Sequence, residues 1–366
     1  MKNKAIPWAN PHYWGNEIEY VTKAIQSTWI SGGSYVDKLE TDFARFCNID
    51  HCVATSNGTT ALHLAYLAGG IQAGDEIIVP GFGFMAAANV AIHMGARPII
   101  ADVDPASWCM ATENLESLIT AKTKAIIPIH TYGNVCDMDS IVSIAEKHKL
   151  LVIEDAAEAI GSKYKGKMAG TIASLGTYSF HATKTITTGE GGSVVSSSVE
   201  LANKMRVLRS HGMSQKRYWH DVAGHNFRLT NMQAAIGCAQ LEKIDVIRVA
   251  RNRIYKMYQI WLQNSHGITF QKIENNVEPL IWAVGIKLDK RAYPQGRDGV
   301  IKQLEELDIE TRPGFYAASM MKHLYGEIKS PVSDDVSAQT ISLPSSPTLT
   351  EDNINYICSS LISLQR

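Results

Sequence analysis

The sequence predicts an α/β protein: a mostly parallel central sheet flanked by helices, followed by a smaller α+β domain. Short apolar runs alternate with amphipathic stretches through the first two-thirds of the 366 residues. Continuous apolar runs are typical of strands buried on both faces of a parallel sheet. From about Thr230 the pattern becomes mainly helical. The alternation and its later loss predict a large domain at residues 1–245 and a small one at 246–366.

The expected sheet of the large domain has seven strands. They are His51–Thr55, Glu76–Pro80, Pro98–Asp102, Ala125–His130, Leu150–Glu154, Gly176–Phe180 and Gly192–Ser196. Helical periodicity falls between several of them, over Thr59–Ala68, Met85–Met94 and Met138–His148. Strands that alternate with helices in this way predict βαβ units and a parallel sheet.

The expected small domain follows a long helical stretch. Met232–Leu241 leads into the charged region Glu242–Arg253. A strand-like run covers Leu280–Leu288, a helical pattern covers Gly299–Leu307, and a last helix starts at Glu351. This mixture predicts an α+β domain.

Composition excludes several classes of partner. Lys and Arg total 35 against 36 Asp and Glu, a formal net charge of -1, so no basic excess indicates a nucleic-acid partner. No apolar run approaches the roughly 20 residues that span a bilayer. The first residues, Met1–Trp8, lack the apolar stretch of a secretory signal. We therefore expect a cytoplasmic protein that binds neither nucleic acid nor membrane.

Cysteines and histidines are scattered along the chain. The six cysteines form no CxxC pair, which indicates reduced thiols rather than a disulfide framework. The twelve histidines form no HxH, HExxH or mixed Cys/His spacing. No metal site is expected.

One lysine stands between an expected strand and a glycine turn. Lys184 follows the apolar run ending at Phe180 and precedes Gly189, Gly191 and Gly192. Glycines let the backbone approach a bound group closely. A lone lysine is usually a solvated surface charge, but one held where its pKa falls can act as a nucleophile through its neutral amine. The setting of Lys184 favours the second interpretation.

An aspartate follows another expected strand. Asp155 comes directly after Leu150–Glu154, at the edge of the sheet where ligands bind in open α/β folds. A carboxylate there can keep a cofactor's pyridine nitrogen protonated, so that the ring accepts electrons from a substrate carbanion. Taken alone, Asp155 is better explained as the N-cap of a helix starting at Ala156. Together with Lys184, it indicates a pyridoxal phosphate enzyme with Lys184 as the Schiff-base lysine.

Two further segments could contact such a cofactor. Ser56–Thr60 precedes an expected helix, and its glycine, hydroxyls and backbone N–H groups suit a phosphate, although an ordinary capping turn uses the same atoms. The hydroxyl of Ser179 could bond the phosphate as well. Phe84, after the strand Glu76–Pro80, could stack on a flat ring, but an aromatic there is more often core.

Arginines and aromatic residues gather before the change of pattern. Arg217–His220 and His225–Arg228 suit recognition of a nucleotide sugar, with arginine for the diphosphate and aromatics for base or sugar. The same composition suits a subunit interface, and both interpretations can hold. Arg312 is another candidate anion contact, with a surface arginine as the alternative.

These segments resemble the DegT/DnrJ/EryC1/StrS family of sugar aminotransferases, which have the aspartate aminotransferase type I fold. The resemblance covers nearly the whole chain. It rests on Ser27–Ser31, Thr55–Leu64, Asp155 with its flanks, Ser179–Gly192, the region of Asn226, and Ser342–Ser345. The large domain would then be the one that binds pyridoxal phosphate.

The resemblance implies roles for residues around the cofactor ring. Lys184 would bind the cofactor covalently, Asp155 would pair with the pyridinium, and Phe84 would stack on the ring. Glu158 departs from the commonest pattern, which has glutamine near the ring oxygen. The branch resembling perosamine synthases often has Ala-Glu-Ala at this point, so the change does not imply loss of function.

The resemblance also implies a shared site. Gly58, Thr59 and Ser179 would hold the phosphate, helped by Asn226 from the other subunit of a homodimer. The residues proposed to bind substrate are Trp29, His181, Arg217, Tyr218, Trp219, His220, Arg228 and Arg312.

Within the family, Lys184–Gly192 and Arg217–Asp221 look most like enzymes that aminate C4 of a nucleotide-linked 4-keto-6-deoxyhexose. L-Glutamate would supply the amino group, and the cofactor would alternate between pyridoxal and pyridoxamine phosphate. The product would be GDP-perosamine, from GDP-4-keto-6-deoxymannose, or dTDP-4-amino-4,6-dideoxyglucose, from dTDP-4-keto-6-deoxyglucose. Such sugars would feed O-antigen (lipopolysaccharide) synthesis.

Three alternatives stay open. The same residues would serve a C3 aminotransferase acting on a dTDP-3-keto-6-deoxyhexose, or a non-catalytic regulator with the same fold. Gly81–Ala86 fits the loose GxGxxA pattern of a dinucleotide-binding dehydrogenase, with Asp102 further on. That pattern leaves Asp155 and Lys184 unexplained.

Overall fold

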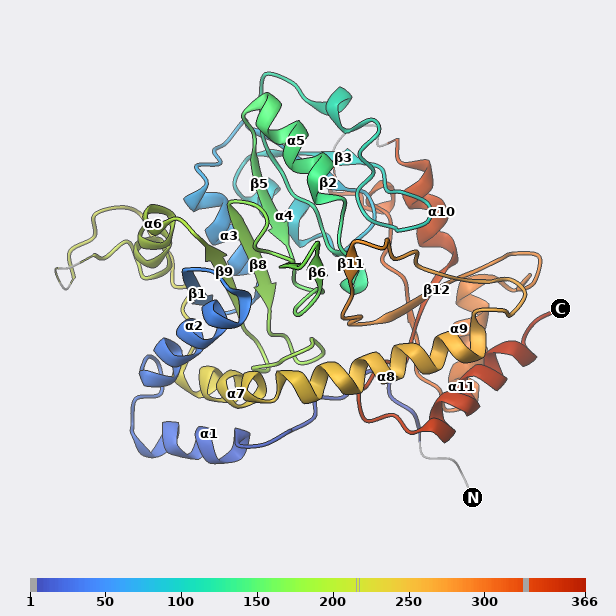
Figure 1. The fold of residues 1–366 in the computed structure, drawn as a ribbon. Coiled ribbons are helices and arrows are strands. Elements are labelled where there is room, and N and C mark those ends of the chain that lie inside the picture. The colour runs from blue at the N-terminus through green and yellow to red at the C-terminus, as the bar shows by residue number, and fades with distance from the viewer. Residues whose placement is uncertain (1–4, 215, 217, 325–328) are drawn as a thin grey trace.

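The computed structural model describes residues 5–214, 216, 218–324 and 329–366 (Figure 1). Its largest sheet has seven strands in the order β1-β9-β8-β5-β4-β2-β3, and only β9 runs antiparallel to its neighbours. The mostly parallel sheet predicted from the sequence is confirmed. The strands are β1 (His51–Thr55), β2 (Glu76–Pro80), β3 (Arg97–Ala101), β4 (Thr123–Ile126), β5 (Leu151–Asp155), β8 (Leu175–Ser179) and β9 (Gly192–Ser196).

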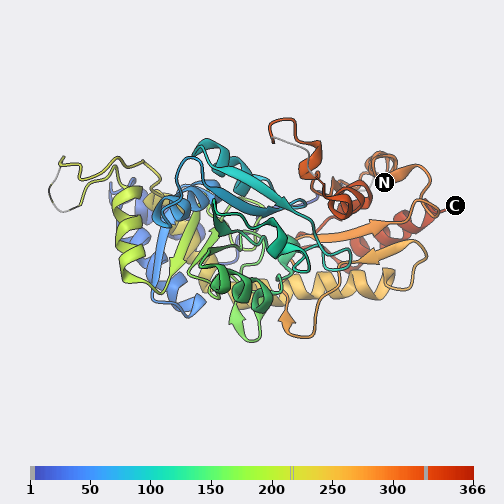
Figure 2. The ribbon, with the colours of Figure 1, turned by 90° about the horizontal axis from the view of Figure 1, so that it is seen from above.

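Both faces of this sheet are covered by helices (Figures 1 and 2). Successive residues of one strand belong to different core clusters: Cys52 and Ala54 pack on one face, and Val53 packs on the other. This two-residue alternation between two buried faces explains the continuous apolar runs. One face is covered by α2 (Ser34–Cys47), α5 (Met138–His148) and α7 (Asn231–Glu242), the other by α3 (Gly58–Ala68), α4 (Ala86–His93) and α6 (Val199–Arg209).

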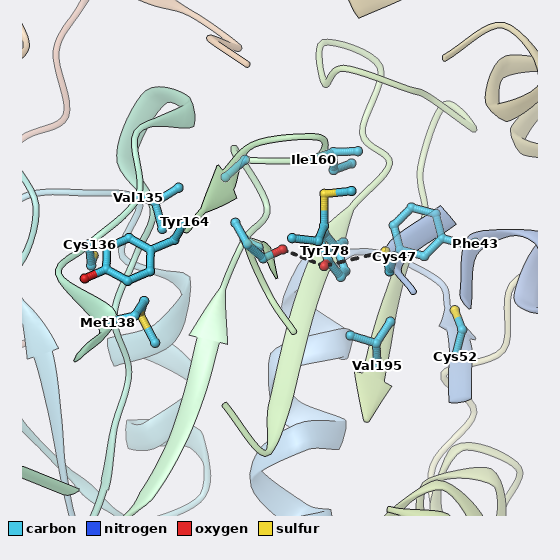
Figure 3. Packing of buried hydrophobic residues seen from close by; sticks show 14 of the residues in the cluster. Phe43, Cys47, Cys52, Val135, Cys136, Met138, Ile160, Tyr164, Tyr178 and Val195 are labelled. Carbon is cyan, nitrogen blue, oxygen red and sulfur yellow. Dashed lines mark hydrogen bonds between the residues drawn. The ribbon is translucent and has the colours of Figure 1, made fainter. Parts of the chain in front are cut away.

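Figure 3 shows the first of these faces. Phe43 of α2 packs edge-on against Tyr178 of β8, with ring centroids 5.0 Å apart. The Tyr178 hydroxyl donates a hydrogen bond to the Ala169 carbonyl at 2.6 Å and accepts one from the Cys47 thiol. All six cysteines are buried and free, and burial raises the pKa of the Cys47 thiol to about 12. These thiols act as apolar packing groups.

The predicted strand at Ala125–His130 is wrong at its end. Strand β4 stops at Ile126, and Pro128 cannot donate a ladder hydrogen bond. The chain nevertheless stays against the sheet: Ile127 N–H donates to the Ile78 carbonyl, and His130 N–H donates to the Asp155 carbonyl. The other six predicted strands agree with the structure to within one residue at each end.

The smaller sheet has the order β10-β12-β14-β13, and all its pairs are antiparallel. It shares a core with the C-terminal helices and with Ile6. The predicted strand at Leu280–Leu288 starts only at Val284, because Trp282 and Ala283 pack against loops of the large sheet. The strands and helices of this part of the chain are β10 (Ile268–Phe270), β12 (Val284–Leu288), β13 (Arg312–Pro313), β14 (Thr340–Leu343), α9 (Gly296–Glu306), α10 (Pro331–Gln339) and α11 (Glu351–Ser363).

The long helix α8 (Ile244–Leu262) joins the two sheets, lying along both in Figure 1. The predicted boundary at residues 245 and 246 falls inside its first turn, and the division into two domains stays a prediction. The remaining elements are α1 (Glu17–Gln26), the three-stranded sheet of β6 (Lys163–Tyr164), β7 (Lys167–Met168) and β11 (Val277–Glu278), and the short 3-10 helices η1 (Leu115–Leu118), η2 (Thr131–Gly133) and η3 (Ala318–Met320).

Among the described residues, none of the helices is both long enough and apolar enough to cross a membrane.

Candidate active site

Lys184 lies in the loop that joins β8 to β9. The loop is closed by hydrogen bonds from Phe180 N–H to the Gly191 carbonyl at 2.7 Å and from Thr188 N–H to the Phe180 carbonyl at 2.9 Å. Lys184 N–H donates to the His181 carbonyl within the same loop. Only 12% of the lysine side chain is exposed. Lys184 is therefore not the solvated surface charge that a lone lysine usually is.

The Lys184 amine has a carboxylate on one side and an aromatic ring on the other. Its Nζ lies 3.7 Å from Oε1 of Glu158 and 3.5 Å from the centre of the Trp282 ring. Burial lowers the pKa of Lys184, while Glu158 and Asp155 act in the opposite direction. The lowered pKa favours the neutral amine that a nucleophile or general base requires.

Asp155 is buried at the carboxyl end of β5. Its Oδ1 accepts a hydrogen bond from Ala157 N–H at 3.1 Å. No helix starts at Ala156, because the chain continues in turns, so the N-cap interpretation is wrong. Burial raises the pKa of Asp155, and the Ala157 N–H and Lys184 oppose that rise. A buried carboxylate in this position is stabilised by a cationic partner.

Glu158 is buried beside Lys184, with 3% of its surface exposed. Its Oε2 accepts a hydrogen bond of 2.7 Å from Tyr132 N–H. Tyr132 has the left-handed φ of 61°, which is uncommon for an aromatic residue and turns its N–H toward the carboxylate. Burial raises the pKa of Glu158, and Lys184 opposes the rise.

The candidate phosphate turn lies against β8. Asn57 caps α3: its side chain accepts from Thr60 N–H, and its own N–H donates to the Thr60 hydroxyl. The next two N–H groups, of Gly58 and Thr59, have no hydrogen-bond acceptor among the described residues. A Cβ on Gly58 would lie 2.9 Å from the Cβ of Ser179, so these residues are in contact. The turn both caps the helix and leaves donors free for an anion.

Phe84 lies just beyond β2 with 60% of its surface exposed. Its ring meets Phe315 edge-on at 6.2 Å, whereas its neighbour Phe82 is fully buried. The structure thus contradicts the core interpretation for Phe84 and leaves its ring available to a ligand.

Asn226 and Arg228 lie on the segment between α6 and α7. The Nε of Arg228 donates to Oδ1 of Asn226 at 3.0 Å, and Ser56 N–H donates to the carbonyl of Phe227 between them. The residue after Asn226 is therefore hydrogen-bonded to the candidate phosphate turn of the same protomer.

The outer part of the same segment extends away from the body of the molecule, as Figures 1 and 2 both show. Tyr218 and Trp219 are 74% and 58% exposed there, and His220 bonds the His211 carbonyl. Arg217 lies outside the described residues. We call the described residues between 210 and 224 the arm.

Three other residues predicted to bind substrate lie outside the arm. Trp29 is 70% exposed near the start of α7, where its carbonyl accepts from Asn231. His181 is in the Lys184 loop, with Nδ1 3.1 Å from the Thr183 hydroxyl. Arg312 lies in β13 of the small sheet and pairs with Glu310. Of these three residues, only His181 lies next to Lys184.

Sequence reasoning missed two residues that contact the Lys184 loop, Trp282 and Arg251. Arg251 of α8 donates hydrogen bonds to the carbonyls of Trp282 and Lys184, at 2.9 and 3.2 Å. Trp282 donates from its indole nitrogen to the Thr183 carbonyl at 2.7 Å. Neither residue belongs to a local motif.

The assembled groups suit pyridoxal phosphate. The free N–H groups at Gly58 and Thr59 suit the phosphate, and the buried Asp155 suits a protonated ring nitrogen. Lys184 offers a buried amine with a lowered pKa. The site thus has groups suited to the phosphate, the ring nitrogen and the aldehyde carbon of the cofactor.

Comparison with known proteins agrees with this chemistry. Residues 13–362 match the DegT/DnrJ/EryC1/StrS aminotransferase family. The chain belongs to that family. The family predicted from the sequence motifs is confirmed, and the chain is a pyridoxal-phosphate-dependent sugar aminotransferase.

Related proteins match over almost their full length. The GDP-perosamine synthase of Caulobacter vibrioides is 41% identical over 363 residues, which are 97% of this chain and 97% of the relative. The GDP-perosamine synthase of Vibrio cholerae is 42% identical over 360 residues, which are 96% of this chain and 97% of the relative.

Solved structures share the fold. The pyridoxamine phosphate form of the putative sugar aminotransferase Spr1654 from Streptococcus pneumoniae has a TM-score of 0.93 and 25% identity, covering 98% of both chains. A 3-amino-5-hydroxybenzoic acid synthase has a TM-score of 0.92 and 26% identity, covering 99% of both chains. These neighbours confirm the predicted type I fold.

Proposed function

We propose that this enzyme transfers the amino group of L-glutamate to C4 of GDP-4-keto-6-deoxymannose, giving GDP-perosamine. The main support is the similarity to two GDP-perosamine synthases at 41% and 42% identity over nearly the whole chain. The structure supports the reaction type, because the buried Lys184 amine lies 3.7 Å from the carboxylate of Glu158 in a site suited to pyridoxal phosphate.

The cofactor would be held by three groups of side chains. Gly58, Thr59 and Ser179 would bind its phosphate through backbone N–H groups and hydroxyls. Asp155 would keep its pyridine nitrogen protonated. When bound, pyridoxal phosphate supplies an electron sink and carries the amino group as pyridoxamine phosphate between the two half-reactions.

Lys184 would serve as covalent anchor and then as proton carrier. Its released Nζ takes the proton from the α-carbon of glutamate and, in the second half-reaction, delivers a proton to C4 of the sugar. Taking the proton needs the neutral amine, and delivering a proton needs the ammonium form. Burial lowers the pKa of Lys184, which favours the neutral form that starts the cycle.

Glu158 would take the part that glutamine has in the commonest family pattern. Its Oε2 accepts a hydrogen bond of 2.7 Å from Tyr132 N–H, and its Oε1 lies 3.7 Å from the Nζ of Lys184. The carboxylate would therefore act on the lysine, by favouring its ammonium form.

We further propose a homodimer in which the arm contributes to the partner's site. The arm extends from the body and carries the exposed aromatics Tyr218 and Trp219. Aromatics and arginines of this kind would bind the guanosine diphosphate, with Asn226 reaching the cofactor phosphate. Trp29, His181, Arg217, His220, Arg228 and Arg312 stay predictions as substrate contacts.

The product has one evident use. A nucleotide-linked amino sugar is an activated donor, so a glycosyltransferase would consume it to build a surface polysaccharide such as O-antigen. The cytoplasmic location predicted from the sequence would supply glutamate and nucleotide sugars, and it too stays a prediction.

A competition assay tests the substrate. The purified enzyme, with pyridoxal phosphate and L-glutamate, receives GDP-4-keto-6-deoxymannose, dTDP-4-keto-6-deoxyglucose and a dTDP-3-keto-6-deoxyhexose together, and mass spectrometry reads the products. We expect the GDP sugar alone to be aminated at C4. Preferred amination of either dTDP sugar would contradict the proposal, and Lys184→Ala is the blank.

A further inference from the structure

Trp282 contacts the Lys184 segment in two ways. The face of its ring lies 3.5 Å from the lysine Nζ, and its indole N–H donates to the carbonyl of Thr183 at 2.7 Å. Only 7% of the tryptophan is exposed. One side chain therefore holds both the backbone before Lys184 and the amine at the end of its side chain.

The backbone of Trp282 is held as well as its ring. Its backbone N–H donates to the Tyr132 carbonyl at 3.0 Å, and its backbone carbonyl accepts from Arg251 at 2.9 Å. Trp8 packs edge-on against the ring, with centroids 5.8 Å apart and an interplanar angle of 86°. Arg251 also binds the Lys184 carbonyl, so tryptophan, arginine and lysine form a closed ring of contacts.

The face of the Trp282 ring is the feature that attracts the lysine amine when the amine is protonated. Lysine has a flexible four-carbon stem, and fixing its end costs rotamer entropy. An aromatic face attracts an ammonium group within about 6 Å of its centroid, most strongly when the ring is tryptophan and the site is desolvated. An aliphatic side chain would fill the same volume without this attraction.

We propose that Trp282 is a positioning residue whose ring face is the resting place of the Lys184 amine whenever that amine is not covalently attached. This inference rests on the proposed role of Lys184 as a lysine that is attached and released in each half-reaction. After release, the amine stays at the site instead of turning to solvent, and Arg251 keeps the ring and the lysine backbone in register.

A neighbouring tryptophan provides the matched control. Trp108 belongs to the same core cluster and is 1% exposed. It packs edge-on against Tyr132 at 6.4 Å, but it makes no cation–π contact with any described lysine. A change at Trp108 tests cluster packing alone.

The test measures the Lys184 amine in the full-length protein before cofactor is added. Trace acetic anhydride labels the lysines across a range of pH, and peptide mass spectrometry reads the labelling of Lys184 relative to the exposed Lys302 of α9. The midpoint of the pH profile is compared, because altered access changes the amplitude but not the midpoint. The charged groups near the amine, Glu158, Asp155 and Arg251, are the same in every variant.

Loss of the aromatic face should lower the midpoint. We expect Trp282→Met to lower it by about 0.5 to 1 pH unit, since the ring favours the ammonium form. Trp282→Phe keeps a face and should stay within about 0.3 units of the native value, and Trp108→Phe should not shift it. Equal midpoints in folded Trp282→Met and the native protein would overturn the proposal.

A second measurement covers the case in which Trp282→Met does not fold. Incorporating tetrafluorotryptophan at the seven tryptophans weakens the ring's attraction for a cation without removing the ring. The midpoint should fall in the native background and stay fixed in Trp282→Phe; a shift of equal size in both would overturn the proposal. Neither experiment uses a sugar substrate, so the assay with keto sugars can fail without affecting this result.

Discussion

The two sides of Lys184 are built on different principles. On one side, Asp155 and Glu158 extend from the end of β5 and supply negative charge, with Glu158 3.7 Å from the amine. On the other, Trp282 and Arg251 come from beyond the large sheet and supply position, through a ring face at 3.5 Å and a hydrogen bond to the lysine carbonyl. Charge thus comes from the sheet edge, and placement comes from the segments packed over it.

The charged groups on the two sides act on the pKa of Lys184 in opposite directions. The carboxylate side raises the pKa of Lys184, whereas burial and the nearby Arg251 lower it. Arg251 pairs with no carboxylate in the described part of the chain, so its charge acts on the lysine without being neutralised. The amine is therefore balanced between two opposing influences, and each side can be changed separately.

The largest effect should come from removing the group that both sides share. Lys184→Ala deletes the covalent anchor and the proton carrier, so we expect turnover to fall more than about 1,000-fold. Steady-state assay of amino sugar formation measures it. Lys302→Ala on α9 is the control, and normal turnover by the Lys184 variant would contradict the assignment.

The carboxylate side should matter next, through Asp155. Asp155→Asn keeps the shape but removes the charge that would hold the cofactor nitrogen protonated, so we expect kcat to fall on the order of 100-fold. Asp139→Asn removes an exposed carboxylate from α5 for comparison. A variant that retained full activity would show that the charge at the end of β5 is not needed.

The phosphate turn is a sheet-edge feature that should act on cofactor affinity. Gly58→Ala places a Cβ 2.9 Å from that of Ser179, which forces the turn open. We expect the dissociation constant for pyridoxal phosphate to rise about tenfold, equivalent to about 1.4 kcal/mol. Fluorescence titration measures it. Gly32→Ala, where nothing lies within 4 Å, should bind normally, and equal affinity in both would refute the contact.

The smallest effect should come from Glu158. Glu158→Gln removes the carboxylate that favours the ammonium form, so the pKa of Lys184 should fall. Because the neutral amine is the active form, the acidic limb of the pH profile of kcat should move to lower pH, with a loss in maximal kcat below about tenfold. A shift of that limb to higher pH would contradict the sign of the interaction.

The sheet-edge side could be predicted from the sequence, because each of its residues follows a strand. Asp155, Phe84 and the Gly58 turn come directly after apolar runs, and a parallel sheet brings such positions to one edge. The strand predicted at Ala125–His130 extends too far, because a single proline, Pro128, in an apolar run does not show where the strand stops pairing with its neighbours.

The other side could not be predicted, for a physical reason. Trp282 lies in a run that reads as strand but pairs only from Val284 onward, and Arg251 lies in a helix that reads as charged and exposed. Their roles arise from packing between segments about 70 to 100 residues apart in the chain. No local spacing encodes such a contact.

The most direct measurement identifies the lysine that binds the cofactor. Purified enzyme loaded with pyridoxal phosphate is reduced with borohydride, which makes the lysine–cofactor linkage permanent, and the digest is mapped by tandem mass spectrometry. We predict a pyridoxyl group on Lys184 and its absence from the Lys184→Ala protein. Stoichiometric modification of another lysine, or none in an active enzyme, would contradict the assignment of Lys184 as the catalytic residue.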